Sequence, residues 1–314
     1  MQNRHSSRQR QRGAALLTAM IIVTLVATLA AAMVWQQWRS VQIEAAERAR
    51  VQAAWILSGA LDFAKLILRE DARSGRPTAL TEPWATPLAE SRLSTFLAVD
   101  KSNADDGPEA FLSGNISDAQ ARYNLTNLVS QGKVDPAELA TLERLCLTAN
   151  LDSSIALRIA NGLRDAMVGT TGAAPLKPLN VAQLTWLGID DASAQALSPY
   201  VVLLPVVTPI NVNTASNEVL TAAVNGLDTA TAEHIAQVRQ RTPFKTIAEF
   251  NAQLGSLPPS TAKLDIRSNY FEVRARLRLV DRVLVERSLL QRLPNGQSSV
   301  LERERVASLE QVGN

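Results

Sequence analysis

The side chains best suited to nucleophilic or acid–base catalysis are few in this chain. It has one cysteine, Cys146, and two histidines, His5 and His234. His5 lies among N-terminal arginines, and His234 occupies a helical position among apolar residues, where we expect a structural role. Cys146, within ERLCLTA, is expected to be a small core residue rather than a nucleophile. A single cysteine excludes an internal disulfide and a cysteine metal cluster, and we expect no enzymatic activity.

Oxygen ligands for a metal ion are concentrated in one polar segment, DKSNADDGPE. Calcium takes carboxylate and carbonyl oxygens, but the segment lacks the alternating carboxylates and the terminal Glu of an EF-hand loop. Solvated loop acids are therefore the favoured interpretation, and we assign no metal site. The four acids are Asp100, Asp105, Asp106 and Glu109.

The overall charge is too small to imply a nucleic-acid partner. The chain of 314 residues is 46% hydrophobic and 20% charged, as expected for a globular protein, and its formal net charge is only +2. The distribution of charge is more informative, because removal of residues 1–13 would leave a formal net charge of +2 − 4 = −2. The four arginines of that segment are Arg4, Arg8, Arg10 and Arg12.

An uncharged apolar run follows these arginines, from Ala14 to Val34. As a helix it would be about 31 Å long, close to the hydrocarbon thickness of about 30 Å in a bilayer. Arginines before the run favour a cytoplasmic N-terminus, and Trp35 and Trp38 follow at interfacial depth. We expect residues 14–35 to cross the inner membrane once, with the C-terminal domain in the periplasm.

Three interpretations of this N-terminus compete. A cleaved secretory signal would use small residues such as Ala30 and Ala32, but its apolar region is only about 7 to 15 residues long. A plain single-pass anchor fits both the length and the flanks. In the third, Gly13 marks a processing site. A basic leader that ends in glycine before a uniform apolar helix resembles the class III signal of type IV pilins and pseudopilins.

That resemblance implies that residues 1–13 are a leader, cut by a prepilin peptidase between Gly13 and Ala14, with methylation of the new amino terminus. The family usually has Glu at the fifth mature position, which here is Thr18. Within a filament that carboxylate needs the terminal ammonium of a neighbouring subunit, since an unpaired buried charge is costly. Thr18 therefore suggests a subunit at the tip, although it equally fits a chain that is no pilin.

The rest of the chain predicts an α+β fold. Residues 36–72 continue the N-terminal helix, prolines interrupt the segment that begins at residue 73, and a short strand is expected near residues 116–123. Alternation in YFEVRARLRLV predicts a half-buried strand, with Asp281 and Arg282 as a turn into a second strand. PNGQ predicts a hairpin into a third strand, Ser298 to Val306. We expect the long helix to cover this small antiparallel sheet, with residues 73–124 and 264–314 completing a pilin-like domain.

Residues 125–263 predict a large helical insertion. Three similar helices follow LDSS, LGIDD and NGLDT, where Asp or Ser is a suitable cap. The third lies in residues 210–254, which resemble the helix-hairpin-helix module of DNA-uptake proteins. That module binds phosphate at a Gly-hydrophobic-Gly hairpin, but here the hairpin is Gly226, Leu227 and Asp228, and the aspartate would repel phosphate. A membrane-anchored DNA-binding or uptake receptor is the alternative function, although we expect no nucleic acid to bind.

Several short motifs, in order along nearly the whole chain, resemble the K-type minor pseudopilins of type II secretion, the general secretion pathway protein K family. They are Glu82 to Trp84, Asp118 to Leu125, Asn211 to Ala215 and Leu289 to Arg292. The resemblance implies a type IV pilin-like fold with a helical insertion, at the tip of a periplasmic pseudopilus with minor pseudopilins I and J, for protein transport across the outer membrane. Some members bind calcium, but no site maps onto this sequence, so we assign no cofactor. Asn124, Asn127, Asn211 and Asn213 are expected to form turns and caps.

Overall fold

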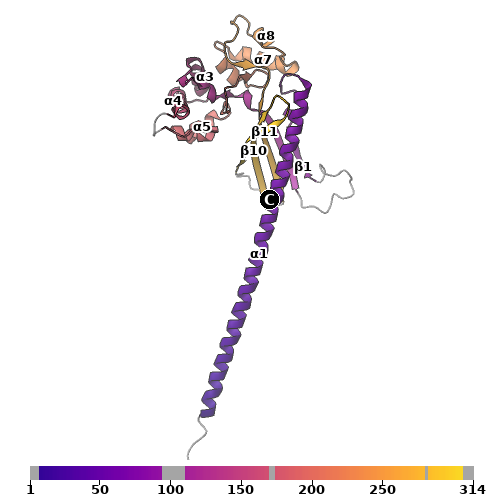
Figure 1. Cartoon of the computed structure of the whole chain (residues 1–314), viewed down its shortest axis with the longest axis vertical. Helices are drawn as coiled ribbons and strands as arrows, with labels where there is room; N and C mark the ends of the chain where they lie inside the picture. Colours follow the sequence, from indigo (N-terminus) through magenta and orange to yellow (C-terminus); the bar gives the residue numbers. More distant parts are fainter. Residues whose placement is uncertain (1–6, 94–109, 170–173, 280–281, 307–314) are drawn as a thin grey trace, which may run out of the picture. The chain divides into compact units, whose positions relative to one another are not determined.

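The structure is a computed structural model that describes residues 7–93, 110–169, 174–279 and 282–306, with side chains from residue 14 onward. Two compact units divide the chain between Ile56 and Leu57. Figure 1 shows the helices and strands with their labels. The first unit is helical, and the second contains a sheet and a group of shorter helices.

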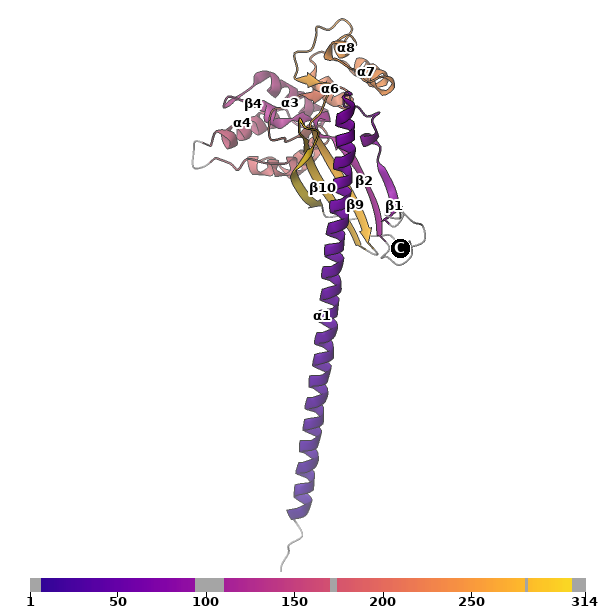
Figure 2. The same cartoon turned by 45° about the vertical axis from the view of Figure 1, so that its right-hand side comes forward.

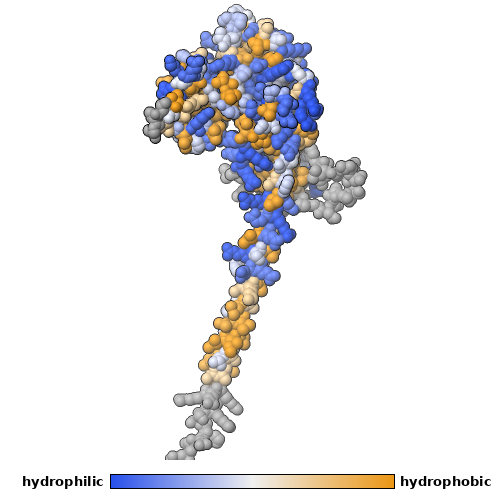
Figure 3. Space-filling view, in the orientation of Figure 1, coloured by the Kyte–Doolittle hydropathy of each residue, from blue (hydrophilic) through white to orange (hydrophobic). Residues whose placement is uncertain are grey.

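The N-terminal helix α1 runs from Ser7 to Ser74, two residues further than the expected end at Ala72. Residues 14–34 are exposed to the surroundings, and Figure 3 shows an orange, hydrophobic surface around this part of the helix. One helix, and only one in the described part of the chain, is long and apolar enough to cross a membrane. This agrees with a single membrane anchor.

A five-stranded antiparallel sheet has the order β1-β2-β9-β10-β11. β11 and the preceding turn match the prediction, and Gly296 provides the positive φ of 77° that this turn requires. The strand expected near residues 116–123 was placed too late, because β2 ends at Asp118. Arg282 lies in β10 rather than in a turn, and Asp281 lies outside the described residues. The strands are β1 (Leu88–Arg92), β2 (Ala110–Asp118), β9 (Tyr270–Leu279), β10 (Arg282–Arg292) and β11 (Ser298–Val306).

The last turns of α1 cover one face of this sheet. Leu61 and Leu68 pack with Phe271, Val273 and Leu290 in one apolar core, and Figure 2 shows β9 and β10 beside this part of the helix. Alternate residues of β9 are buried, as the period of two predicts. The helix-on-sheet arrangement expected from the sequence is therefore confirmed.

The segment between β2 and β9 forms a separate, mainly helical core. Its buried residues extend from Tyr123 to Leu254 in one apolar cluster. Short two-stranded ladders connect parts of this segment, β3 (Tyr123–Asn124) with β6 (Val201–Val202) and β7 (Ile210–Asn211) with β8 (Leu264–Asp265). Another ladder pairs β4 (Val129–Ser130) with β5 (Lys133–Val134). The α-helices are α3 (Pro136–Thr148), α4 (Ser154–Val168), α5 (Asp191–Leu197), α6 (Asn217–Ala223), α7 (Thr229–Arg241) and α8 (Ile247–Asn251).

Helix caps explain where most of these helices begin. Asp190 accepts a hydrogen bond from the Ser193 amide at α5, and Asp228 does the same for Thr231 at α7. At α4 the cap residue Ser153 makes no such bond, and Asp152 binds the Ser154 amide instead. The predicted caps, Asp or Ser, are therefore present at α5 and α7, whereas at α4 the hydrogen bond comes from the neighbouring Asp152.

Candidate functional site

The three N-terminal residues singled out by sequence lie together in α1. Gly13 and Ala14 are consecutive helical residues, and Thr18 follows one turn later. The Thr18 hydroxyl donates back to the carbonyl oxygens of Ala14 and Ala15, at 3.1 and 3.0 Å. A threonine at this position is therefore satisfied by its own helix, whereas a carboxylate could only accept hydrogen bonds and would need a donor from elsewhere.

The hairpin between α6 and α7 has a glycine turn that is followed by an aspartate helix cap. Gly226 has a positive φ of 81°, and Leu227 is buried beside it. The Asp228 carboxylate accepts a hydrogen bond of 2.7 Å from the Thr231 amide, and this bond lowers the pKa of Asp228. The carboxylate thus occupies the Thr231 amide at the start of α7 and places a negative charge where the helix-hairpin-helix module would hold a phosphate.

Of the side chains considered for catalysis, Cys146 and His234 lie within the described residues. Cys146 is buried, and burial raises the pKa of its thiol to about 11, so the thiolate is scarce at neutral pH. His234 is exposed on α7, so it is not packed among apolar residues as expected. His5 and the acidic segment from Asp100 to Glu109 lie outside the described residues. In the parts described, no group of three or more His, Cys, Asp or Glu residues is arranged to hold a metal ion.

A buried polar junction joins the sheet to the helical core, and it is built from the sequence motifs. Its centre is Asp118, at the end of β2, which is 4% exposed. The Asp118 carboxylate accepts hydrogen bonds from the Gln120 amide (2.8 Å), Asn211 Nδ2 (3.0 Å), Thr214 Oγ1 (2.6 Å) and Ser268 Oγ (2.6 Å). Burial raises the pKa of Asp118, and these four donors oppose the rise.

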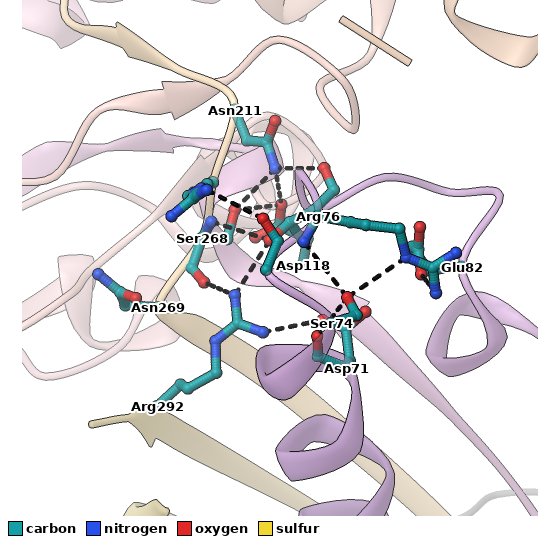
Figure 4. Close-up of polar contacts among 12 residues, drawn as sticks. Asp71, Ser74, Arg76, Glu82, Asp118, Asn211, Ser268, Asn269 and Arg292 are labelled. Carbon is teal, nitrogen blue, oxygen red and sulfur yellow. Dashed lines mark hydrogen bonds and ion pairs between the residues drawn. The ribbon is translucent and has the colours of Figure 1, made fainter. Parts of the chain in front are cut away.

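Asn211 binds three chain segments at once. Its side-chain amide donates to Asp118, to Ser268 Oγ at 2.9 Å and to the Thr78 carbonyl at 3.0 Å. Its carbonyl oxygen accepts from the Asn213 amide. Figure 4 shows Asn211, Ser268 and Asp118 converging from separate segments of the chain. The buried amide therefore fixes the approach of the helical core to the sheet.

Arg292, the last residue of β10, extends this junction to α1. Its guanidinium donates to Asp71 (2.8 Å), to Thr78 Oγ1 (3.0 Å) and to the Ser268 carbonyl (2.6 Å), and it lies over the ring of Phe271. The Asp71 and Arg292 side chains are only 7% and 10% exposed. A planar guanidinium can satisfy all of these partners together, which lysine cannot do.

The Glu-Pro-Trp motif lies next to this arginine. Glu82 is buried and forms an ion pair of 2.9 Å with Arg76. Burial raises the pKa of Glu82, opposed by Arg76 and assisted by the nearby Asp71. Trp84 packs edge-on against Phe271 with ring centroids 5.4 Å apart. Trp84 of this motif therefore packs in the apolar core between α1 and the sheet.

Asn124 and Asn127 are buried and hold the loop after β6. Asn124 Nδ2 donates to the Val206 carbonyl (2.7 Å), and Asn127 exchanges two hydrogen bonds with the backbone of Thr208 (2.8 and 3.1 Å). Asn124 also caps the 3-10 turn from Leu125 to Leu128, as predicted. In the same way, Asn213 pairs with the backbone of Phe244, and Arg239 donates to the carbonyls of Val212 and Ala215.

Comparisons with known proteins agree with this geometry. The family described as type II secretion system (T2SS), protein K, matches residues 210–273, which include Asn211 and Ser268 of the junction. Type II secretion system protein K of Pseudomonas aeruginosa is 30% identical over 95% of this chain and 93% of its own length. The chain belongs to the type II secretion system protein K family. The protein K of Pectobacterium carotovorum is 29% identical over 95% of the chain and 97% of its own.

A solved structure shares the fold of this protein K chain. The GspK-GspI-GspJ complex from enterotoxigenic Escherichia coli contains a chain that matches with a TM-score of 0.63 and 20% identity, over 84% of this chain and 99% of that one. The expected pilin-like helix and sheet with additional helices are therefore confirmed. The expected function, a minor pseudopilin of type II secretion, is confirmed as well, while a DNA-uptake receptor has no support.

The buried junction gives the sequence motifs a structural role that the sequence alone did not indicate. Sequence reasoning treated the asparagines as turn and cap formers and gave Asp118, Ser268 and Arg292 no role. The structure shows that the motif residues meet in one hydrogen-bonded set. The Asp118 carboxylate and the hydroxyls of Thr214 and Ser268 are buried and hydrogen-bonded to one another, an arrangement that suits the rigid joining of two cores.

Proposed function

We propose that this protein K is the tip subunit of the type II secretion pseudopilus, where it initiates or caps assembly with minor pseudopilins I and J. The single observation that carries the tip position is the Thr18 hydroxyl, which is bonded within its own helix. A subunit with no neighbour above it needs no partner for this side chain. The GspI and GspJ chains in the complex of the E. coli relative support the choice of partners.

The processing of the N-terminus belongs to the same proposal. A prepilin peptidase cuts between Gly13 and Ala14 on the cytoplasmic side, and the new amino terminus is methylated. Residues 14–35 then anchor the chain in the lipid of the inner membrane, and the sheet and helical core lie in the periplasm. The apolar, exposed surface of residues 14–34 supports this topology.

The proposed role is structural, without catalysis or a resident cofactor. The buried junction and the raised pKa of the Cys146 thiol support this, since neither offers a reactive group to solvent. The membership in a family of secretion components supports it too. We assign no calcium site, since the described residues contain no group of three or more His, Cys, Asp or Glu side chains that could hold a metal ion.

Mass spectrometry of the mature protein tests the processing step. We expect a methylated Ala14 as the first residue in cells that have the peptidase, and a Gly13→Val variant that keeps residues 1–13. A mature chain that starts at Met1 or near Met33 in peptidase-containing cells would contradict the proposal.

Co-purification tests the tip assignment. The full-length chain, solubilised in detergent, is expected to form a 1:1:1 complex with pseudopilins I and J. Its incorporation at many positions along the pseudopilus, seen by immunogold labelling, would contradict a tip subunit.

A further inference from the structure

The chain contains three Asn-Gly pairs, and each has different surroundings in the fold. Asparagine is a thermolabile residue, and a following glycine makes it more so, because the glycine nitrogen has no Cβ beside it and its backbone turns easily. Reaction requires a glycine amide free of hydrogen bonds and an asparagine side chain that can swing onto it. The pairs are Asn161 with Gly162, Asn225 with Gly226, and Asn295 with Gly296.

The reaction of such a pair takes up one water and releases one ammonia. The glycine nitrogen forms a bond to the asparagine Cγ, and its proton passes through solvent to the leaving nitrogen as the Cγ–Nδ2 bond breaks. The product is a five-membered succinimide ring. Water then opens either of the two ring carbonyls and leaves aspartate or isoaspartate, in which the main chain runs through the former side chain. No oxidant or reductant is consumed.

Helix α4 protects the first pair. Gly162 lies within α4, where its amide belongs to the helical hydrogen-bond ladder. A Cβ at Gly162 would lie 3.0 Å from Leu187 Cβ, so a second element packs closely against this position. The helix must therefore open locally before the Gly162 nitrogen can attack Asn161, and the opening of a packed helix is rare.

Hydrogen bonds of the turn between β10 and β11 engage both reacting groups of the third pair. The Gly296 amide donates to the Leu293 carbonyl at 2.9 Å. The Asn295 side chain accepts from the Gln297 amide at 3.0 Å and donates to Gln297 Oε1 at 3.3 Å. Although Asn295 is exposed, these bonds must break before it can react.

The second pair has neither kind of protection. Asn225 and Gly226 are exposed in the turn between α6 and α7. The Leu227 amide donates to the Val224 carbonyl at 3.2 Å and closes the turn without engaging the pair. Within the described part of the chain, no hydrogen bond is made by the Asn225 side chain or by the Gly226 amide. Both reacting groups are therefore available in the folded state.

This turn is anchored at both ends in the helical core. Val224 and Leu227 are 2% and 4% exposed, and both belong to its apolar cluster. An isoaspartate at position 225 adds one methylene group to the main chain between these two anchors. A closely packed core does not accommodate such a change without displacing side chains. Isoaspartate, unlike aspartate, therefore strains the start of α7.

We propose that Asn225 is a site of spontaneous covalent modification, where attack by the Gly226 nitrogen yields isoaspartate and loosens the hairpin between α6 and α7. Asn225 reacts first, Asn295 more slowly and Asn161 last. This order follows from the fold, since all three asparagines precede a glycine. The modification is independent of N-terminal processing and of the complex with pseudopilins I and J.

Peptide mass spectrometry of the full-length chain, aged in detergent at mildly alkaline pH, tests the proposal. Ageing in water labelled with heavy oxygen marks the new products, and electron-transfer fragmentation distinguishes isoaspartate from aspartate. A parallel incubation in concentrated urea gives the rate of each pair without the fold, where we expect similar rates at all three. In the folded chain, Asn225 should react within about threefold of its urea rate, since its turn needs little or no opening.

The other two pairs are internal controls in the same sample. Folded Asn295 should react at least about fivefold more slowly than in urea, because its hydrogen bonds must break first. Folded Asn161 should react at least about a hundredfold more slowly than in urea, because a packed helix must open.

Two variants separate the reaction from its consequence. Asn225→Gln does not readily close a five-membered ring, so its urea unfolding midpoint should stay unchanged on ageing. Asn225→Asp carries the charge of the product without the extra methylene group, and its midpoint should lie close to that of the fresh wild type. The aged wild type, enriched in isoaspartate, should unfold at a lower urea concentration than either variant.

Four results would overturn the proposal. The first is an Asn225 that stays intact in the folded chain but reacts in urea, and the second is faster reaction of folded Asn161 or Asn295. The third is aspartate without isoaspartate at position 225, which would indicate direct hydrolysis instead of attack by Gly226. The fourth is an aged wild type that contains isoaspartate and unfolds like the fresh protein, which would refute the loosening of the hairpin.

Discussion

Replacing Asp118 by alanine removes the centre of the buried junction. Four donors would lose their acceptor, but not all would be left unpaired. Asn211 Nδ2 keeps the Thr78 carbonyl, and Thr214 Oγ1 keeps the Asn211 carbonyl at 3.4 Å. The Gln120 amide and the Ser268 hydroxyl have no other acceptor among their described hydrogen bonds.

Two orphaned donors set the size of the effect. Each buried, unpaired donor costs about 1–3 kcal/mol, so Asp118→Ala should destabilise the protein by about 2–6 kcal/mol. The lower part of this range is favoured, because the raised pKa of Asp118 shows that burial of its charge is itself unfavourable. The fluorescence of Trp84, which is 1% exposed in the adjoining core, should report the loss during urea unfolding.

Asp152→Ala is the matched control. Asp152 also accepts a backbone hydrogen bond at a helix start, but it is exposed. Its loss should destabilise the protein less than the loss of Asp118, because solvent can replace the lost acceptor. If Asp118→Ala costs no more than Asp152→Ala, the hydrogen bonds of the junction do not hold the two cores together and the reasoning is wrong.

Three further predictions follow from local geometry. Asp228→Ala should destabilise the protein at neutral pH, because it removes the cap of α7. Since the folded pKa of Asp228 is lowered, its contribution is present above the unfolded value of 3.8 and should vanish as pH falls through the folded pKa, measured by urea unfolding from pH 7 to 3. Cys146, with a pKa of about 11, should react with a thiol reagent at pH 7.5 only after unfolding, and fast labelling of the native chain would contradict its burial. Thr18→Glu should impair the complex with pseudopilins I and J, because it adds an unpaired charge to the apolar helix. Thr18→Val adds no charge and should leave the complex unchanged. Equal complex yields for the two variants, measured by co-purification, would refute the role given to Thr18.

Elements with a clear period were predictable from the sequence. The alternation of Phe271, Val273 and Ala275 indicated the buried face of β9, and the residues Asn295 and Gly296 indicated the hairpin. β1 was missed because it is short and lies between prolines and a polar loop. β2 was placed too late because its apolar pattern weakens at Gly114, where a Cβ would lie 2.6 Å from the Arg274 carbonyl oxygen.

The junction could not be predicted in the same way. Asp118 bonds to residues 93, 96 and 150 positions away in the sequence, so no local pattern brings them together. The sequence motifs of the family contain most residues of the junction, but they do not indicate which of these residues hydrogen-bond to one another. The role of Asp228 could be predicted, since it caps a helix through the Thr231 amide, only three residues away in the sequence.

The pairing of β2 with β9 has a consequence for how the chain folds after export. Ile116 lies opposite Val273, and the whole helical core separates them in the sequence. Closing so long a loop is slow and entropically costly for an unfolded chain. In the folded helical core the two ends already lie together, since the Asn269 amide donates a hydrogen bond to Gln120 Oε1. We therefore expect the helical core to fold first and to act as a template on which the sheet assembles. Pulse-labelling hydrogen exchange during refolding should protect α3 and α4 before β9.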